Sequence, residues 1–303
     1  MGERGRNPWI TVLLMAILAL IWGSSFILMK RGLFHEGRPV LSPMQMASAR
    51  LAIAWLALSP LLFRHAVHLR RNGLPLLATG LLGNGVPAFL FAWGQSRIDS
   101  SLAGMLNSLT PLFTLLVGAC FFGARVRAVH VVGVLLGLAG AVGLVAFSAN
   151  NTGAAWSVYA VLPVLGTLCY GFSGNIVKTR LYMLPPAATA VLALSFVGPI
   201  GLVGAWATDL PGTLMAHPHA WRSLGFVALL AVLSSALSLV LWNALLQRTS
   251  AVTASTVTYL MPVVALTWGM LDGEVLVPKQ LVMIVVVLVG VHLVGRREAI
   301  RTT

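Results

Sequence analysis

The sequence is divided into ten apolar runs of about 20 residues, separated by short polar segments. Roughly 20 apolar residues is the length that an α-helix needs to cross a bilayer. Only 9% of the residues are charged, against roughly 25% in soluble domains. The sequence therefore predicts an all-α membrane protein with ten transmembrane helices, at 9–30, 42–63, 74–95, 101–122, 128–148, 155–177, 187–207, 222–246, 251–271 and 278–295.

The distribution of Lys and Arg predicts the orientation of these helices, because cytoplasmic loops carry the excess of positive charge. If the N-terminus is cytoplasmic, the inside segments hold thirteen Lys and Arg residues and the outside segments hold six. Both termini are therefore expected in the cytoplasm. The formal net charge of +13 belongs to these flanking segments, and we expect no nucleic-acid partner because no basic run accompanies an aromatic platform.

The two halves of the chain repeat one another. Segments 22–30 and 170–178 share an aromatic residue, a glycine and a lysine at an offset of 148 residues, and further matches follow at offsets of 151 and 150. These matches are Arg97, Ala103, Leu109, Pro111, Gly123 and Gly140 with Arg248, Ala254, Leu260, Pro262, Gly273 and Gly290. The pattern predicts two five-helix repeats, 1–150 and 151–303. Because five is odd, the second repeat would be inverted in the membrane.

Prolines and polar residues interrupt three of the predicted helices. Segment 106–113 contains Asn107 and Pro111, segment 256–263 contains Pro262, and the third span contains Pro87. A proline removes a backbone hydrogen bond and bends a helix, which is tolerated in a membrane only where neighbours satisfy the freed group. Paired breaks in two repeats point to a transporter's binding site. We expect Pro87, Pro111 and Pro262 to act as hinges or gates.

Several short motifs resemble the EamA type of the drug/metabolite transporter superfamily, which includes YddG-like amino-acid exporters. The motifs are segment 21–26, the Arg50-Leu51 pair, segment 107–113 and the Gly273-Glu274 turn. The resemblance implies two EamA repeats, ten helices and export of small metabolites, amino acids first, especially aromatic or neutral ones. From the inverted repeats and their broken helices we expect alternating access about a midplane cavity, in a bacterial-type inner membrane.

Polar and aromatic residues in helices 1, 3, 4, 6, 8 and 9 are the candidates for a central substrate cavity. A polar side chain in hydrocarbon is costly unless it bonds a neighbouring helix or faces water. Aromatic rings can also stack on flat or cationic ligands. The alternative for any single Ser or aromatic residue is helix packing. The candidates are Trp22, Ser25, Asn84, Asn107, Tyr170, Asn175, Ser235, Ser238, Trp242 and Tyr259.

Arg50 is the charged residue that lies deepest in a predicted span. It is expected to anchor a substrate carboxylate or an outer gate, or to bond helix-end carbonyls in a structural role. The seven acidic residues all lie in termini or loops, and no Walker sequence is present. A facilitator or exporter that works down a gradient is therefore expected. No metal or cofactor is expected, and the partners are the small-molecule substrate and the bilayer.

Two alternatives from other classes remain. Ser173 and His130 fit fragments of intramembrane serine-protease motifs, although their order along the chain is reversed and Ser173 has a repeat partner in Ser25. The other alternative is a membrane receptor that does not transport. Within the transporter class, an exporter of cationic drugs is the alternative to an amino-acid exporter. Gly133, Gly137 and Gly140 form a small-residue face that suits helix packing or a weak dimer.

Overall fold

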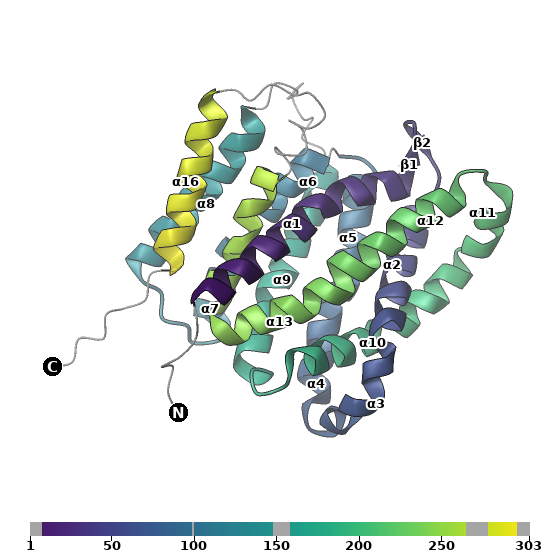
Figure 1. Cartoon of the computed structure of the whole chain (residues 1–303), viewed down its shortest axis with the longest axis horizontal. Helices are drawn as coiled ribbons and strands as arrows, with labels where there is room; N and C mark the ends of the chain where they lie inside the picture. The colour runs from purple at the N-terminus through teal and green to yellow at the C-terminus, as the bar shows by residue number, and fades with distance from the viewer. Residues whose placement is uncertain (1–7, 99, 148–157, 265–277, 296–303) are drawn as a thin grey trace.

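The computed structural model describes residues 8–98, 100–147, 158–264 and 278–295. Helices account for almost all of this part of the chain, and a single two-stranded hairpin accompanies them. The all-α prediction is confirmed. Helix α1 begins and α16 ends on the same side of the bundle (Figure 1), as an even number of crossings requires.

The helical elements follow the predicted spans closely, with several spans divided into shorter pieces. In chain order they are α1 Pro8–Leu33, α2 Pro43–Leu58, η1 Ser59–Leu61, α3 Leu62–His65, η2 Ala66–His68, α4 Leu69–Gly80, η3 Leu81–Gly85, α5 Val86–Gln95, α6 Ser100–Asn107, α7 Thr110–Phe121, α8 Ala128–Ala146, η4 Val158–Ala160, α9 Val161–Arg180, α10 Pro186–Ala207, α11 Leu210–Ala216, α12 Ala220–Leu229, η5 Leu230–Leu237, α13 Ser238–Arg248, α14 Ala251–Ser255, η6 Thr256–Leu260 and α16 Pro278–Gly295. Residues 265–271 of the ninth predicted span lie outside the described residues.

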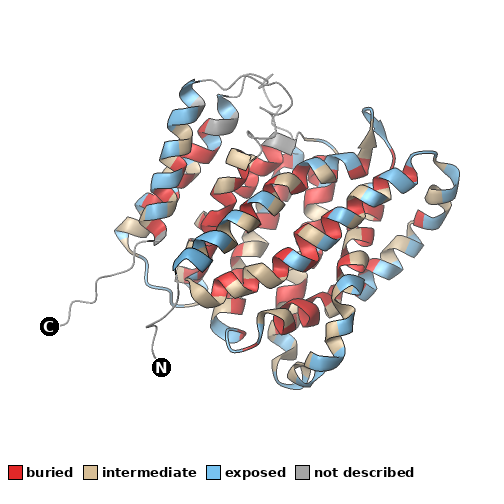
Figure 2. Cartoon of the chain, viewed as in Figure 1, coloured by how far each residue is buried: buried red, intermediate tan, exposed pale blue. Residues whose placement is uncertain are grey.

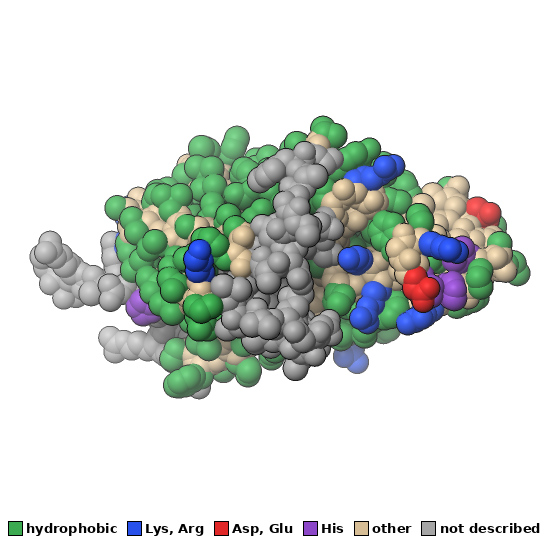
Figure 3. Space-filling view, turned by 90° about the horizontal axis from the view of Figure 1, so that it is seen from above, with side chains coloured by type: hydrophobic (Ala, Val, Ile, Leu, Met, Phe, Trp, Pro, Cys, Tyr) green, Lys and Arg blue, Asp and Glu red, His purple; other side chains and the backbone are tan. Residues whose placement is uncertain are grey.

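The outer surface of the bundle is apolar. Large hydrophobic side chains such as Leu13, Val203 and Val285 are more than half exposed, and Figure 2 shows exposed residues on the outward faces of the helices. Seen from above, charged and His side chains gather toward the end that holds β1, β2 and α11 (Figure 3). Among the described residues, six helical segments are long and apolar enough to span a membrane, and three shorter apolar helices accompany them. The count of ten crossings stays a prediction.

The connection between the second and third spans differs from the prediction. The second span was expected to reach residue 63, but α2 ends at Leu58 and short helical turns continue to α4. Pro60 lies in the first of these turns, where its missing N–H ends the regular helix. A second unpredicted feature is the hairpin that joins α1 to α2, in which β1 (Phe34–His35) pairs with β2 (Arg38–Pro39). Glu36 and Gly37 both have positive φ there, as a tight hairpin turn requires.

Equivalent helices of the two halves lie against one another. Helix α2 packs along α10, α8 along α16, and α7 against α14. A further contact is matched as well, because α1 packs on α13 as α9 packs on α5. This arrangement is what a pseudo-two-fold relation between two repeats would produce, and it supports the duplication found in the sequence.

The glycine face of α8 is used within the chain. A Cβ added at Gly133 would lie 2.9 Å from the Gly290 carbonyl oxygen, and one at Gly140 would lie 2.8 Å from Val287. Both neighbours belong to α16. Side chains at these positions would therefore push the two helices apart, and the helix-packing interpretation of this face is confirmed.

Candidate functional site

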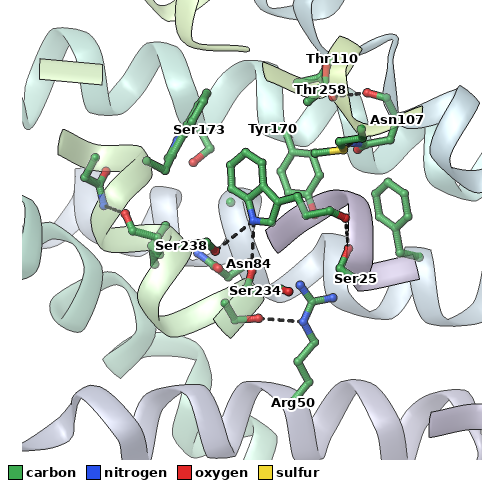
Figure 4. A pocket seen from close by; sticks show the side chains of 18 of the residues that line it. Ser25, Arg50, Asn84, Asn107, Thr110, Tyr170, Ser173, Ser234, Ser238 and Thr258 are labelled. Atoms are coloured by element: carbon green, nitrogen blue, oxygen red, sulfur yellow. Dashed lines mark hydrogen bonds between the residues drawn. The ribbon is translucent and has the colours of Figure 1, made fainter. Parts of the chain in front are cut away.

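A cavity lies where the broken helices meet, between the two halves of the chain. Its volume is about 110 Å³. Its wall takes residues from α1, α2, α4, η3, α5, α6, α7, α9, η5, α13 and η6, and Met261 follows η6 directly. Figure 4 shows the polar side chains of these elements converging on one space. The lining residues are Trp22, Ser25, Phe26, Met29, Arg50, Thr79, Gly83, Asn84, Phe91, Asn107, Thr110, Tyr170, Ser173, Val177, Ser234, Ser235, Ser238, Leu239, Trp242, Asn243, Thr258 and Met261.

The structure places most of the sequence-predicted cavity residues in this wall. Those that line it are Trp22, Ser25, Asn84, Asn107, Tyr170, Ser235, Ser238 and Trp242. Arg50, expected as an anchor or gate, is there as well. Asn175 and Tyr259 are absent from the lining, and so are Pro87, Pro111 and Pro262. Substrate contact by any of these residues stays a prediction.

Asn175 serves as a link between helices. Its Nδ2 donates to the Thr114 carbonyl at 3.0 Å and to the Gly171 carbonyl at 2.8 Å. Its side chain also fills the space over Gly118, where an added Cβ would lie 2.9 Å from Oδ1. The side-chain amide of Asn175 therefore joins α9 to α7. The prediction that Asn175 lines the cavity was wrong.

Tyr259 points away from the cavity, toward α8. Its hydroxyl donates to the Val134 carbonyl at 2.8 Å, and its side chain is fully buried. The ring lies over Gly137, where an added Cβ would come within 2.5 Å of it. Tyr259 therefore packs helix against helix, and its placement in the cavity is also corrected.

Other lining residues could have been found from helical spacing. On α1 the wall takes Trp22, Ser25, Phe26 and Met29, which are spaced three, four and seven residues from the first. This is the spacing of one face of an α-helix. On α9 the same spacing relates Tyr170 to Ser173 and Val177. Once Trp22 and Tyr170 were chosen, the periodicity indicated their neighbours.

Trp22 joins α1 to η5 and α13. Its Nε1–H donates to the Ser238 hydroxyl at 2.9 Å and lies 3.2 Å from the Ser234 carbonyl oxygen. The Ser234 hydroxyl in turn donates to the Ile21 carbonyl at 3.3 Å. These bonds fix the indole ring so that it forms part of the cavity wall. Satisfying the indole N–H also removes the cost of burying it.

Aromatic rings form two clusters in the wall. The Trp22 and Trp242 rings lie 5.6 Å apart between centroids and are tilted by 54°. Phe91 stacks on Tyr170 with centroids 5.9 Å apart and 20° between the planes, and Phe26 lies 6.5 Å from Phe91. All three separations fall in the range that aromatic pairs prefer. The wall therefore offers apolar ring surface beside its polar groups.

Two π-helical segments occupy equivalent places in the two halves. Segment η3 carries Asn84 and η5 carries Ser235, and an offset of 151 residues relates the two. Val86 N–H donates to the Leu81 carbonyl, five residues back, and Ser238 N–H donates to Leu233 in the same way. Such segments are rare and often mark functional sites. Pro87 follows η3, and no proline follows η5. The two repeats therefore share the π turn but not the proline.

The fourth and ninth predicted helices are both broken beside the cavity. Helix α6 stops at Asn107 and α7 starts at Thr110, while the ninth changes to a 3₁₀ turn over Thr256–Leu260. Pro111 cannot donate to the carbonyl of Asn107, and the Thr110 hydroxyl donates to it instead at 2.7 Å. The breaks themselves are as the sequence predicts, and a hinge role for their prolines stays a prediction.

Arg50 brings a positive charge into the wall. Its Nε–H donates to the Ser235 hydroxyl at 2.8 Å, which links α2 to η5. In Figure 4 the side chain extends from its helix toward the other lining residues. Within the described residues no carboxylate lies within ion-pair distance of it, since His35–Glu36 is the salt bridge found there.

Three lining residues have polar atoms that find no hydrogen-bond partner in the described part of the chain. They are the Nδ2 of Asn84, the Oγ1 of Thr79 and the Oδ1 of Asn243. Asn243 uses its Nδ2 on the Leu239 carbonyl at 2.8 Å. Buried polar groups are normally bonded. Residues of the cavity wall therefore hold two donors and one acceptor that are buried and whose hydrogen bonds are unmet.

The described residues contain no group of three or more His, Cys, Asp or Glu side chains that could hold a metal ion. Ser173 lines the cavity, whereas His130 does not, so the two residues of the protease alternative do not meet in this site. What remains is a polar and aromatic chamber inside a helical membrane bundle. The class of protein that this combination defines is a membrane carrier for small molecules.

Comparison with known proteins agrees with this class. Residues 9–146 and 157–296 each match the EamA-like transporter family. The chain belongs to the EamA-like transporter family, and it is a multi-pass membrane transporter of small metabolites that contains two copies of the family's domain. The alternative of an intramembrane protease has no support from this family.

Several relatives cover nearly the whole chain. A "probable terminal-alkyne amino-acid exporter" of Streptantibioticus cattleyicolor is 29% identical over 287 residues, which cover 93% of this chain and 92% of the relative. A "probable amino-acid metabolite efflux pump" of Salmonella typhimurium is 26% identical, with 92% and 93% covered. The "uncharacterized inner membrane transporter YedA" of Escherichia coli K12 is 28% identical, with 86% and 82% covered.

A solved structure shares the fold. The crystal structure of a protein superposes with a TM-score of 0.69 and 18% identity, and the match covers 95% of this chain and 96% of that one. At this identity the likeness speaks for the arrangement of the helices alone.

Proposed function

We propose that this protein exports amino acids, neutral and aromatic ones first, across a bacterial inner membrane. The observation that carries the proposal is the cavity between the two halves, lined by fixed aromatic rings and by polar atoms without partners. Two relatives named as amino-acid exporter and efflux pump support the substrate class. The relative named as an inner membrane transporter supports the location.

The size of the cavity supports a small substrate. On the same scale as its volume of about 110 Å³, one water molecule needs roughly 10–15 Å³. The space therefore fits roughly ten non-hydrogen atoms, which is the size of a neutral amino acid. The rings of Phe91 and Tyr170 offer an apolar surface for its side chain.

The mechanism we propose is alternating access by rocking of the two repeats about this cavity. Backbone groups inside a membrane must stay bonded throughout the cycle. The breaks at Asn107–Thr110 and Thr256–Leu260 are already formed, and the Thr110 hydroxyl already satisfies the carbonyl left free at the first of them. Existing bends allow the halves to move without breaking further hydrogen bonds. Export down a gradient of the substrate requires no ionisable coupling residue.

Counterflow into liposomes tests the proposal. The full-length protein, reconstituted into liposomes loaded with one unlabelled amino acid, should accumulate that labelled amino acid above the level of protein-free liposomes. A panel of neutral, aromatic and charged amino acids identifies the preferred one. Uptake at the protein-free level for every amino acid would contradict the proposed function and favour a receptor that does not transport.

A second candidate function is export of cationic compounds. The observation in its favour is the pair of indole rings, Trp22 and Trp242, that face the same cavity. Indole faces attract cations. Cationic compounds in the same counterflow panel decide between the two functions, because the preferred substrate shows the fastest exchange.

A further inference from the structure

The guanidinium of Arg50 is a charge without a counter-ion in the described cavity. It is bonded through Nε to the Ser235 hydroxyl, and its two Nη nitrogens make no hydrogen bond or ion pair with any described residue. The acids of the described chain are engaged elsewhere: Glu36 lies 3.8 Å from His35, and Asp209 caps α11 by accepting from the Gly212 N–H. The cavity wall therefore carries one positive charge and no negative one.

A buried charge is costly unless it is paired, and removing a partner from such a charge is strongly destabilising. Ionisable residues inside membrane proteins face cavities and mark substrate paths. Arg50 fits this description, because its side chain lines the cavity. The missing partner must then come from the substrate or from solvent.

We propose that Arg50 binds the carboxylate of the substrate, so that the site selects solutes with a free carboxylate and rejects amines that lack one. The inference rests on the proposed export of amino acids and deepens it. The Nε–H bond to Ser235 holds the guanidinium in place, while the Nη groups remain free for the two oxygens of a carboxylate, the geometry that arginine provides best.

The other unpartnered groups suit the same ligand. The Nδ2 of Asn84 is a further donor for a carboxylate oxygen, and the Oδ1 of Asn243 is an acceptor for an N–H group of the solute. A zwitterion offers both kinds of group. A cation without a carboxylate offers nothing to the guanidinium and meets its like charge, which disfavours it.

Competition on the wild-type protein tests the selection directly. Counterflow of labelled L-phenylalanine is measured against unlabelled L-phenylalanine, 3-phenylpropanoate and phenethylamine, which carry both charged groups, the carboxylate alone and the amine alone. We expect the two carboxylates to compete and phenethylamine to be at least about tenfold weaker. Equal competition by phenethylamine would overturn the carboxylate anchor even if phenylalanine is transported well.

The variants Arg50→Gln and Arg50→Lys separate binding from structure. Arg50→Gln should raise the KM for phenylalanine at least about tenfold and should remove the preference over phenethylamine, while Arg50→Lys should restore part of that preference. Arg38→Gln is the control, because it neutralises an exposed arginine outside the cavity lining and should keep the preference. A structural role would change protein yield or rate in Arg50→Gln but leave the ratio of competitors as in the wild type, which would refute the proposal.

The failure of this inference can be told apart from failure of the proposed function. Binding of 3-phenylpropanoate without transport of any amino acid would sustain the anchor and contradict amino-acid export. Transport of phenylalanine without preference for carboxylates would do the reverse. A protein that binds neither phenylalanine nor 3-phenylpropanoate would overturn both.

Discussion

The hydroxyl of Thr110 donates to the carbonyl oxygen of Asn107 at 2.7 Å, and this carbonyl is the one that Pro111 leaves without a helical N–H. At the break between α6 and α7, the Thr110 hydroxyl therefore replaces the backbone donor that the proline lacks. Without it a buried acceptor would face hydrocarbon or the cavity, at a cost of about 1–3 kcal/mol.

Thr110→Val should accordingly destabilise the protein by about 1–3 kcal/mol, because valine has the shape of threonine and lacks the donor. Thermal unfolding in detergent measures the change. Thr114→Val is the matched control, since Thr114 donates to the Thr110 carbonyl inside regular helix α7 at 2.8 Å. If both variants unfold at the same temperature, the Thr110 bond does not compensate for the proline.

Pro111→Ala should slow transport more than it lowers the amount of folded protein. Alanine restores an N–H at position 111 and allows α6 and α7 to join into a straighter helix, which removes the existing bend. Counterflow per folded molecule in liposomes measures the effect. Pro199→Ala is the control, because Pro199 lies inside α10 and is exposed, away from the cavity lining. Transport equal to wild type in Pro111→Ala would refute the hinge.

Trp22→Phe and Ser238→Ala should each destabilise the protein, and the double variant should cost less than the sum. Their direct hydrogen bond of 2.9 Å should give a coupling of about 0.5–1.5 kcal/mol in a double-mutant cycle. Thermal unfolding of the four proteins provides the values. The corresponding change at Trp93, an exposed indole outside the cavity lining, should leave stability near wild type. Additive effects of Trp22→Phe and Ser238→Ala would contradict a direct link.

Gly137→Ala should destabilise the protein by about 1–3 kcal/mol. The new methyl group would lie 2.5 Å from the buried ring of Tyr259, and the hydroxyl bond of that ring to Val134 limits its movement. Gly225→Ala in α12 is the control, because open space surrounds that position, and a better helix former there should be neutral or stabilising. Tolerance of Gly137→Ala would show that Tyr259 is free to move.

Asn107→Ala and Asn175→Ala should affect different properties. Asn107 lines the cavity, where its Nδ2 contacts the Met261 sulfur at 3.1 Å, so its loss should reduce counterflow at near-normal stability. Loss of Asn175 removes two bonds to backbone carbonyls and should lower the unfolding temperature, with nearly normal counterflow per folded molecule. Parallel measurement of both properties checks the assignment, and the opposite pattern would contradict it.

The sequence predicted best those features that depend only on the order of residues along one helix. Length and hydropathy located the helices because a bilayer demands about 20 apolar residues in each. Pro111 located a break in the fourth helix because proline has no N–H to donate to the carbonyl four residues earlier. The turns after α2 were missed because Phe63 and Val67 continue the apolar pattern although the regular helix has ended at Leu58.

Side-chain direction was predicted less well, because it depends on what each helix packs against. Asn175 and Tyr259 have the polarity expected of cavity residues, yet each bonds a carbonyl of a neighbouring helix. Nothing in the local sequence of either residue distinguishes the two outcomes. The π turn in η5 could not be predicted from the sequence either, because no proline or glycine interrupts Leu230–Leu237.

The two π turns make the cavity sensitive to the number of residues in a helix as well as to their identity. The hydrogen bond of a π turn spans one residue more than that of an α turn, so deleting one residue from Leu81–Gly85 would leave a regular α turn and keep Phe91 on the face that meets Tyr170. The deletion would instead change the direction of Gly83 and Asn84, which the π turn places in the cavity wall. The number of residues in each turn therefore helps to set which side chains line the cavity, even where the flanking helices are unchanged.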